Sequence, residues 1–211
     1  MCIRDRSDTI HIHAFSPLEI SHGANCANTD VKSYLLKLKE AGLNSLPGTA
    51  AEILDDNVRE VICPDKINTN EWLNVIKAAH SIGLPTTSTM MFGHVENYHD
   101  IAKHMHELKS LQLESNGITE FVPLPYVASE APMYLRGLSR SGPSFRESVL
   151  VHSISRIYFN ESIKNIQGSW VKMGYAGLSY LLDSGINDVG GILMNETITR
   201  SAGATHGQEL D

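Results

Sequence analysis

The chain alternates a short apolar strand with a helical segment six times, and this alternation restricts its fold more than any other feature. Each strand candidate ends in a turn rich in glycine, proline or acidic residues. Repeated strand–helix units build a parallel sheet, and such folds carry their chemistry where the carboxyl ends of the strands meet the loops. The six expected strands are Thr9–Phe15, Asn44–Leu46, Thr86–Met91, Ile118–Leu124, Asn165–Gly168 and Gly185–Val189.

The segments between the strands have one apolar face each at helical spacing, which predicts helices packed on the sheet with water on their far side. Thr69 or Asn70 is the expected N-cap of the second helix. The expected apolar faces are Tyr34–Leu35–Leu38–Ala41, Trp72–Leu73–Ile76–Ala79–His80, Ile101–Met105–Leu108–Leu111, Leu150–Ile154–Ile157 and Leu178–Leu181–Leu182.

The number of units points to an incomplete barrel. A closed (β/α)8 barrel has eight units and takes about 250 residues, whereas this chain has 211. Because the sequence starts on a strand and stops soon after a short helix, we expect an α/β fold that is a partial TIM-type barrel. We expect one domain over residues 8–211. Residues 1–7 are charged and aperiodic, and we interpret them as a non-native start.

Composition narrows the function classes. The net charge is −7 and no block of Lys or Arg occurs, so nucleic-acid binding is not expected. No apolar run reaches the roughly 18 residues of a membrane span. The three cysteines, Cys2, Cys26 and Cys63, form no CxxC motif. A sparse, odd cysteine count is typical of a reducing compartment, which predicts a cytoplasmic protein without disulfides.

The first strand carries two histidines. Strand alternation places His11 and His13 on one face. A His-x-His pair at a strand end can bind zinc, and His94 with Asp188 would complete the site of a metal-dependent hydrolase. The alternative is that both imidazoles are hydrogen-bonded interior groups or face a substrate.

The other strand ends are polar as well. Leu46–Glu52 contains a Pro-Gly turn followed by a carboxylate, and Thr86–Met91 alternates hydroxyls with methionines where a buried strand would favour Val and Ile. Glu120 lies inside a strand, where it needs an ion-pair partner or a solvated pocket. Gly190-Gly191 before a short helix is either an anion site or a tight turn.

These motifs together resemble a known family. HIHAFSP, SLPGTAAEIL, TTSTMMFGHVE, TEFVPLP, IQGSWVKMG and GINDVGGILMNETITRSAGATHG are similar to FO synthase subunit 2, a radical S-adenosylmethionine (SAM) family of deazaflavin coenzyme biosynthesis. The aminofutalosine-type synthases of menaquinone biosynthesis share the SLPG–AEI and TxxxGHxE features. The TEFVPLP, QGSWVK and NDVGG stretches favour the FO synthase family.

The resemblance implies a radical SAM barrel and its cofactors. A [4Fe–4S] cluster held by a CxxxCxxC loop binds SAM, and the resulting radical acts on L-tyrosine. The 4-hydroxybenzyl group then joins 5-amino-6-(D-ribitylamino)uracil, in a protein paired or fused with FO synthase subunit 1. By strand order, the six strands correspond to the third to the eighth of such a barrel.

One departure from the family decides what this chain can do alone. It lacks CxxxCxxC, and Cys26 and Cys63 cannot replace it. We therefore expect no metal ligands here, and an inactive polypeptide even where the longer parent is an enzyme. A partial barrel serving as a non-catalytic scaffold is a third interpretation, although its open strand edges would favour aggregation.

The resemblance also implies roles for individual residues. Polar groups matched to each ribityl hydroxyl and uracil amide would discriminate strongly between substrates. The residues expected at the cofactor are Thr49, Glu52, Gly93 and Glu96, and those expected at the substrates are His13, Ser16, Glu120, Gln167, Ser169, Trp170, Asn187 and Asp188.

Overall fold

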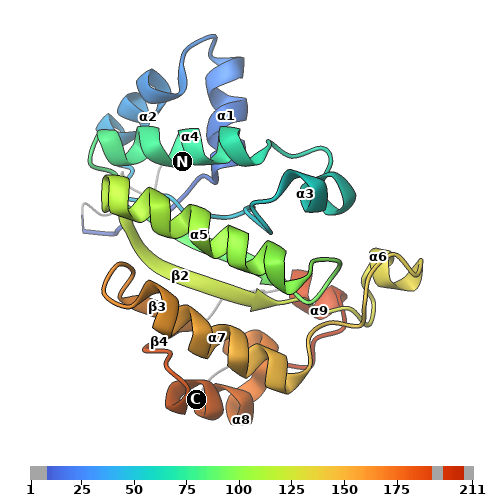
Figure 1. The fold of residues 1–211 in the computed structure, drawn as a ribbon. Coiled ribbons are helices and arrows are strands. Elements are labelled where there is room, and N and C mark those ends of the chain that lie inside the picture. Colours follow the sequence, from blue (N-terminus) through green and yellow to red (C-terminus); the bar gives the residue numbers. More distant parts are fainter. Residues whose placement is uncertain (1–8, 192–196, 207–211) are drawn as a thin grey trace.

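A parallel sheet organises the molecule. The computed structural model describes residues 9–191 and 197–206, so the expected non-native start at residues 1–7 lies outside the described part. The sheet has four strands in the order β1-β2-β3-β4, and all of them are parallel (Figure 1). The strands are β1 Thr86–Phe92, β2 Ile118–Pro125, β3 Asn165–Gly168 and β4 Asp188–Val189.

The first two expected strands are present only as single bridges. His13 bridges Ser45, and Leu46 bridges Thr86, both in parallel orientation. The segments therefore lie in the expected order beside β1, but the expectation of full strands at Thr9–Phe15 and Asn44–Leu46 is wrong. The first segment passes into α1 at Pro17, and Pro47 follows the second segment, so neither continues as a strand.

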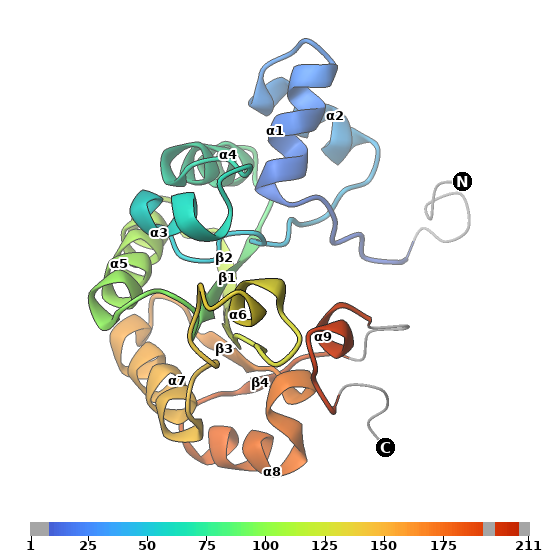
Figure 2. The same cartoon turned by 90° about the vertical axis from the view of Figure 1, so that its right-hand side faces the viewer.

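Helices surround this sheet. Figure 2 shows α5 and α7 along one side of it and the short α9 on the other, and Figure 1 shows α6 beyond the carboxyl end of β2. The helices α1, α3, α6 and α9 were not expected from the apolar periodicity. The bounds are α1 Pro17–Cys26, α2 Val31–Glu40, α3 Asp56–Ile62, α4 Thr69–Ser81, α5 Tyr98–Ser115, α6 Pro132–Leu135, α7 Phe145–Phe159, α8 Trp170–Asp183 and α9 Ile198–Ser201.

Capping residues fix where the long helices start. Asn68 caps α4 and exchanges hydrogen bonds with Glu71, so the cap lies one residue before the expected Thr69. Asn97 and Asp100 form the same arrangement at the start of α5. That helix ends at Asn116, whose φ of +49° is a left-handed conformation that asparagine tolerates.

The main core lies between the sheet and the helices. Phe121 of β2 packs edge-on against Phe159 of α7, with ring centroids 4.9 Å apart. Phe92 of β1 approaches His152 in the same manner at 6.3 Å. All four of these rings are buried, so α7 is held on the sheet by its Val151–Phe159 side.

This arrangement overturns the expected apolar face of α7. Leu150, Ile154 and Ile157 are 45%, 52% and 78% exposed. The buried side includes His152 and Ser155, which hydrogen-bond to backbone carbonyls one turn earlier at 2.7 Å each. Polar side chains satisfied in this way can be buried at little cost. Leu182 of α8, also expected in the core, is 48% exposed.

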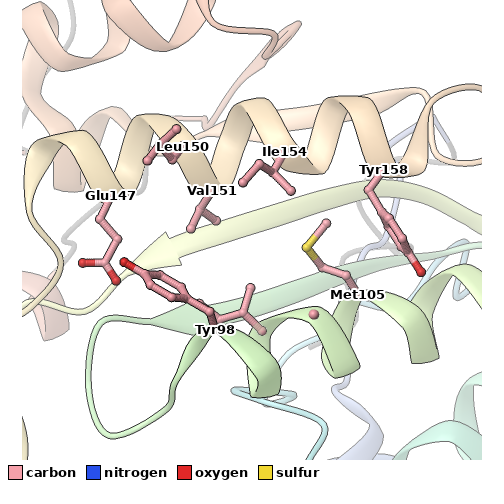
Figure 3. Close-up of a pocket in the computed structure, with 9 residues that line it drawn as sticks. Tyr98, Met105, Glu147, Leu150, Val151, Ile154 and Tyr158 are labelled. Carbon is pink, nitrogen blue, oxygen red and sulfur yellow. The ribbon is translucent and has the colours of Figure 1, made fainter.

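The exposed apolar face of α7 forms one side of an apolar groove. It lies between α5 and α7, has a volume of about 440 Å³, and is bordered by Tyr98, Met105, Leu150 and Ile154 among others (Figure 3). The groove is on the helix surface. In the described part of the chain, no helix is long and apolar enough to cross a membrane.

The two faces of α7 predict opposite mutational effects. Phe159→Ala removes a side chain that is 1% exposed and should lower the free energy of unfolding by about 3–5 kcal/mol. Ile157→Ala, on the same helix but 78% exposed, should change it by less than about 0.5 kcal/mol. Urea unfolding of both variants measures the difference. Equal losses would mean that the Leu150–Ile157 face is packed after all.

Candidate functional site

The sheet face that points away from α5 and α7 carries several polar side chains. Along β1, Ser88, Met90 and Phe92 are fully buried on the helix side. Strand alternation therefore directs Thr87 and Thr89 to the other face. In β2 the same rule applies, since Phe121 packs on α7 and Glu120 points the opposite way. We refer to this second side as the concave face.

Three neighbouring strands bring Glu120, Gln167 and Asp188 together on the concave face, and we call this group the carboxyl floor. Gln167 Nε2 donates to Glu120 Oε2 over 3.0 Å, and Gln167 pairs in register with Asp188. Glu120 Oε1 is shut off from solvent without a hydrogen-bond partner among the described residues. Burial first, and then the neighbouring Asp188 carboxyl group, raises the pKa of Glu120 to about 7.

The two histidines of the first segment do face the same way. His11 Nε2 and His13 Nδ1 each lie 2.7 Å from the Ser45 hydroxyl. Burial, with a smaller contribution from His11, lowers the pKa of His13. Within the described ranges, no group of three or more His, Cys, Asp or Glu is placed to hold a metal ion.

The other two ligands of the hydrolase alternative lie elsewhere. His94 Nε2 is 2.9 Å from the Met91 carbonyl oxygen, and Asp188 belongs to the carboxyl floor. The described residues therefore do not assemble the His11, His13, His94 and Asp188 constellation.

Thr49 and Glu52 lie in the segment that runs along the end of β1. The Glu52 carbonyl accepts the Met91 N–H at 2.9 Å, and the residue has a φ of +45°. Its carboxylate forms an ion pair with Lys66 and remains 15% exposed. Thr49 is exposed as well. A ligand at this edge can therefore reach both side chains.

Gly93 and Glu96 form a closed structure at the end of β1. The buried Glu96 carboxylate accepts the N–H groups of Gly93 and His94 at 2.6 and 2.8 Å, and Arg140 donates to it at 2.8 Å. Arg140 also pairs with Glu147 of α7 at 2.7 Å. The hydrogen bonds that Arg140 donates to the two carboxylates, Glu147 first, raise the pKa of Arg140.

Glycine is required at position 93. Its φ is +98°, and an added Cβ would lie 2.2 Å from Pro143 Cδ. Both oxygens of the Glu96 carboxylate already accept hydrogen bonds. We call Glu96, Arg140 and Glu147 the rim clamp. It ties the end of β1 to the 136–143 loop and to α7.

Four other residues expected at the substrates make structural contacts. Ser16 caps α1 and exchanges hydrogen bonds with Glu19. Asn187 Oδ1 accepts the Ile166 N–H at 2.9 Å and Arg156 Nη2 at 2.6 Å. Ser169 precedes α8 and is buried, and Trp170 is a core residue whose Nε1 has no partner among the described residues.

Comparison with known proteins identifies the family. The profile of the radical SAM superfamily matches residues 5–108, and that of the CofH/MqnC C-terminal region matches residues 115–211. The chain thus matches the radical SAM superfamily over residues 5–108. This finding confirms the resemblance drawn from the motifs, and it agrees with the parallel α/β fold described above.

The related sequences are transferases and FO synthases. The 5-amino-6-(D-ribitylamino)uracil–L-tyrosine 4-hydroxyphenyl transferase of Methanocaldococcus jannaschii is 53% identical over 198 residues, which are 94% of this chain and 55% of that protein. The transferase of Methanopyrus kandleri is 47% identical over 99% of this chain and 57% of its own length. The FO synthase of Nocardia farcinica is 48% identical over 97% of this chain, but only 24% of that protein.

The chain thus spans about half the length of the transferases that it matches. Among solved structures, methylornithine synthase superposes with a TM-score of 0.60 at 18% identity, over 81% of this chain and 47% of that one. That likeness supports the fold, a partial TIM-type barrel.

The radical SAM family uses SAM and a [4Fe–4S] cluster, and the described residues fit the two groups differently. Exposed Thr49 and partly exposed Glu52 can reach a ligand such as SAM. The cluster needs three thiolates, whereas the described cysteines are exposed Cys26 and buried Cys63. Burial raises the pKa of the Cys63 thiol. The described residues therefore do not fit the cluster.

Sequence reasoning missed three polar residues at this site. Ser45 links the two histidines, Lys66 pairs with Glu52, and Arg140 holds the rim clamp. Lys66 and Arg140 lie in loops without periodicity, so no local pattern marks them. Ser45, in contrast, sits beside the SLPG motif, where a strand-end hydroxyl was a usable signal.

The rim clamp predicts a large effect from one loop residue. Arg140→Met leaves two buried carboxylates without their cation and should lower the free energy of unfolding by about 2–3 kcal/mol, somewhat less than a fully buried pair because Arg140 is 40% exposed. Lys77→Met breaks an exposed pair with Glu114 and should cost less than about 1 kcal/mol. Chemical denaturation compares the two variants. Similar losses would argue against the clamp.

Proposed function

We propose that this chain is part of a radical SAM transferase. The enzyme joins the 4-hydroxybenzyl group of L-tyrosine to 5-amino-6-(D-ribitylamino)uracil, which leads to the deazaflavin FO. One observation carries the proposal: a transferase named for these two substrates is 53% identical over 94% of the chain. The polar concave face supports it, because both substrates offer several hydrogen-bonding groups.

In this proposal the substrates lie against the concave face. His13, Glu120, Gln167 and Asp188 contact them directly, since these side chains project from neighbouring parallel segments. Ser16 and Asn187 keep the surrounding backbone in place through the hydrogen bonds described above, and Ser169 and Trp170 are buried beside the substrates. The protein then contributes binding, orientation and exclusion of water.

The cofactor has its own part of the site. SAM and a [4Fe–4S] cluster supply the radical chemistry when both are bound. We assign Thr49 and Glu52 to SAM because their side chains can be reached from outside. Gly93 and Glu96 act on the same edge by fixing the loop that follows β1, since their hydrogen-bonding groups are already paired.

A second protein or domain works with this enzyme in our proposal. The same segment is 55% of the transferase but only 24% of the Nocardia FO synthase. The Nocardia FO synthase is therefore more than twice as long as the transferase. This additional sequence supports pairing or fusion with FO synthase subunit 1. A cytoplasmic location is part of the proposal and rests on the sparse cysteines and the lack of a long apolar run.

An aminofutalosine-type synthase is the second candidate, because this chain has the SLPG–AEI and TxxxGHxE features that those synthases share. The test uses the full-length gene product, purified without oxygen and supplied with iron, sulfide, reductant and SAM. We expect a product that contains carbon from L-tyrosine and requires the aminouracil, detected by mass spectrometry. SAM cleavage that ignores both substrates, or turnover of a menaquinone precursor instead, would overturn the proposal.

The SAM assignment predicts a loss of affinity at one carboxylate. Glu52→Gln removes the charge that accepts hydrogen bonds at the edge of β1, and hydrogen bonds to charged groups contribute about 1.5–3 kcal/mol. SAM should therefore bind the reconstituted full-length protein at least about tenfold more weakly. Equilibrium dialysis measures this without turnover. The control is Glu114→Gln on α5, an exposed residue that should leave SAM affinity unchanged. Equal binding by Glu52→Gln would remove Glu52 from the SAM site.

A further inference from the structure

We propose that the carboxyl floor holds one proton between Glu120 and Asp188, and that in this protonated form it recognises the lactam edge of the uracil ring. The inference rests on the proposed function and deepens it, since it assigns one substrate to one wall of the site. The proposal concerns binding of the uracil only, so no covalent bond is made or broken.

The first argument is the missing donor. Gln167 Nε2 satisfies Glu120 Oε2, but Oε1 is closed off from solvent and no described residue donates to it. A buried carboxylate oxygen without a donor is strongly unfavourable. Asp188, which pairs in register with Gln167, is the acidic neighbour of this carboxyl group, and two ionised carboxylates bring no hydrogen at all. One proton shared by the pair supplies the donor that the geometry lacks.

The second argument concerns the charges around the pair. Gln167 on β3 is neutral, and the residue opposite Glu120 on β1 is the neutral Thr87. On β4 the facing group is Asp188, whose charge and hydrogen bond both favour the neutral form of Glu120. None of the described Lys, Arg or His residues contributes to the pKa shift of Glu120. No positive neighbour therefore lowers this pKa from about 7.

The third argument is the match to the ligand. A lactam presents an N–H donor beside a carbonyl acceptor. The singly protonated floor offers both a carboxyl hydrogen and carboxylate acceptors, and Gln167 adds an amide of the same pattern. Gly190 leaves room there, since a Cβ at that position would lie 2.9 Å from Gln167 Oε1.

L-Tyrosine fits the same wall less well. Its carboxylate would be repelled by the acidic pair, and its ammonium group would prefer the doubly ionised floor. The two substrates therefore predict opposite pH dependences. Binding of the uracil should weaken as the pH rises through the Glu120 pKa, whereas an ammonium bound at the floor would bind more tightly over the same range.

The test measures binding of 5-amino-6-(D-ribitylamino)uracil to the reconstituted full-length gene product by anaerobic calorimetry. If only the protonated floor binds, the dissociation constant should rise about 30-fold between about pH 6 and about pH 8.5. Glu120→Gln imitates the neutral carboxyl group and should keep the low-pH affinity within about threefold at every pH. Glu120→Ala should bind the uracil about tenfold more weakly than the wild type at low pH, or weaker still.

Several results would overturn the inference. A wild-type affinity for the uracil that stays constant or increases between those two pH values would overturn it without any variant. A Glu120→Gln protein that binds the uracil as weakly as Glu120→Ala, while melting like the wild type, would overturn it as well. In these cases product formation from both substrates would still leave the proposed function standing. If neither the uracil nor L-tyrosine binds at any pH, both the inference and the proposed function fail.

Discussion

The rest of the structure depends on the strict alternation of side chains across one parallel sheet whose two faces have opposite surroundings. Phe92 and Phe121 anchor the helices on one face. The same two strands direct Thr87 and Glu120 to the other face. A slip of one residue would press Glu120 against the aromatic ring of Phe159 and turn Phe121 toward the site, so the dry core fixes the register of the polar face.

The edge of the site is held by charge rather than by apolar packing. Glu96 closes the turn after β1, and Arg140 connects it to Glu147 at the start of α7. This clamp keeps the loop after β2 close to the end of β1, and the Glu96 carboxylate at its centre is closed off from solvent. Glu52, with a partly exposed carboxylate, remains available beside it. Structural and ligand-facing acids can therefore lie close together, because burial separates their roles.

Local patterns predict this fold where one interaction dominates. The bounds of β3 match the expectation, and β1 and β2 differ by one residue each, because both faces of these strands have a clear residue pattern. The expected face of α7 fails because His152 and Ser155 lie on the buried side, where His152 Nδ1 and the Ser155 hydroxyl bond to carbonyls of their own helix, and an apolar pattern ignores such bonds. The rim clamp joins residues 44 positions apart, and no spacing rule reaches that far.

The contrast between the apolar groove and the carboxyl floor shows why volume alone does not identify a site. The groove between α5 and α7 is large, but its one carboxylate, Glu147, already serves Arg140. The floor is small, yet it retains an acceptor that the described residues leave without a donor. Radical chemistry needs its substrates oriented by directional contacts. Unsatisfied polar groups on rigid strands provide such contacts, and an apolar surface on two helices does not.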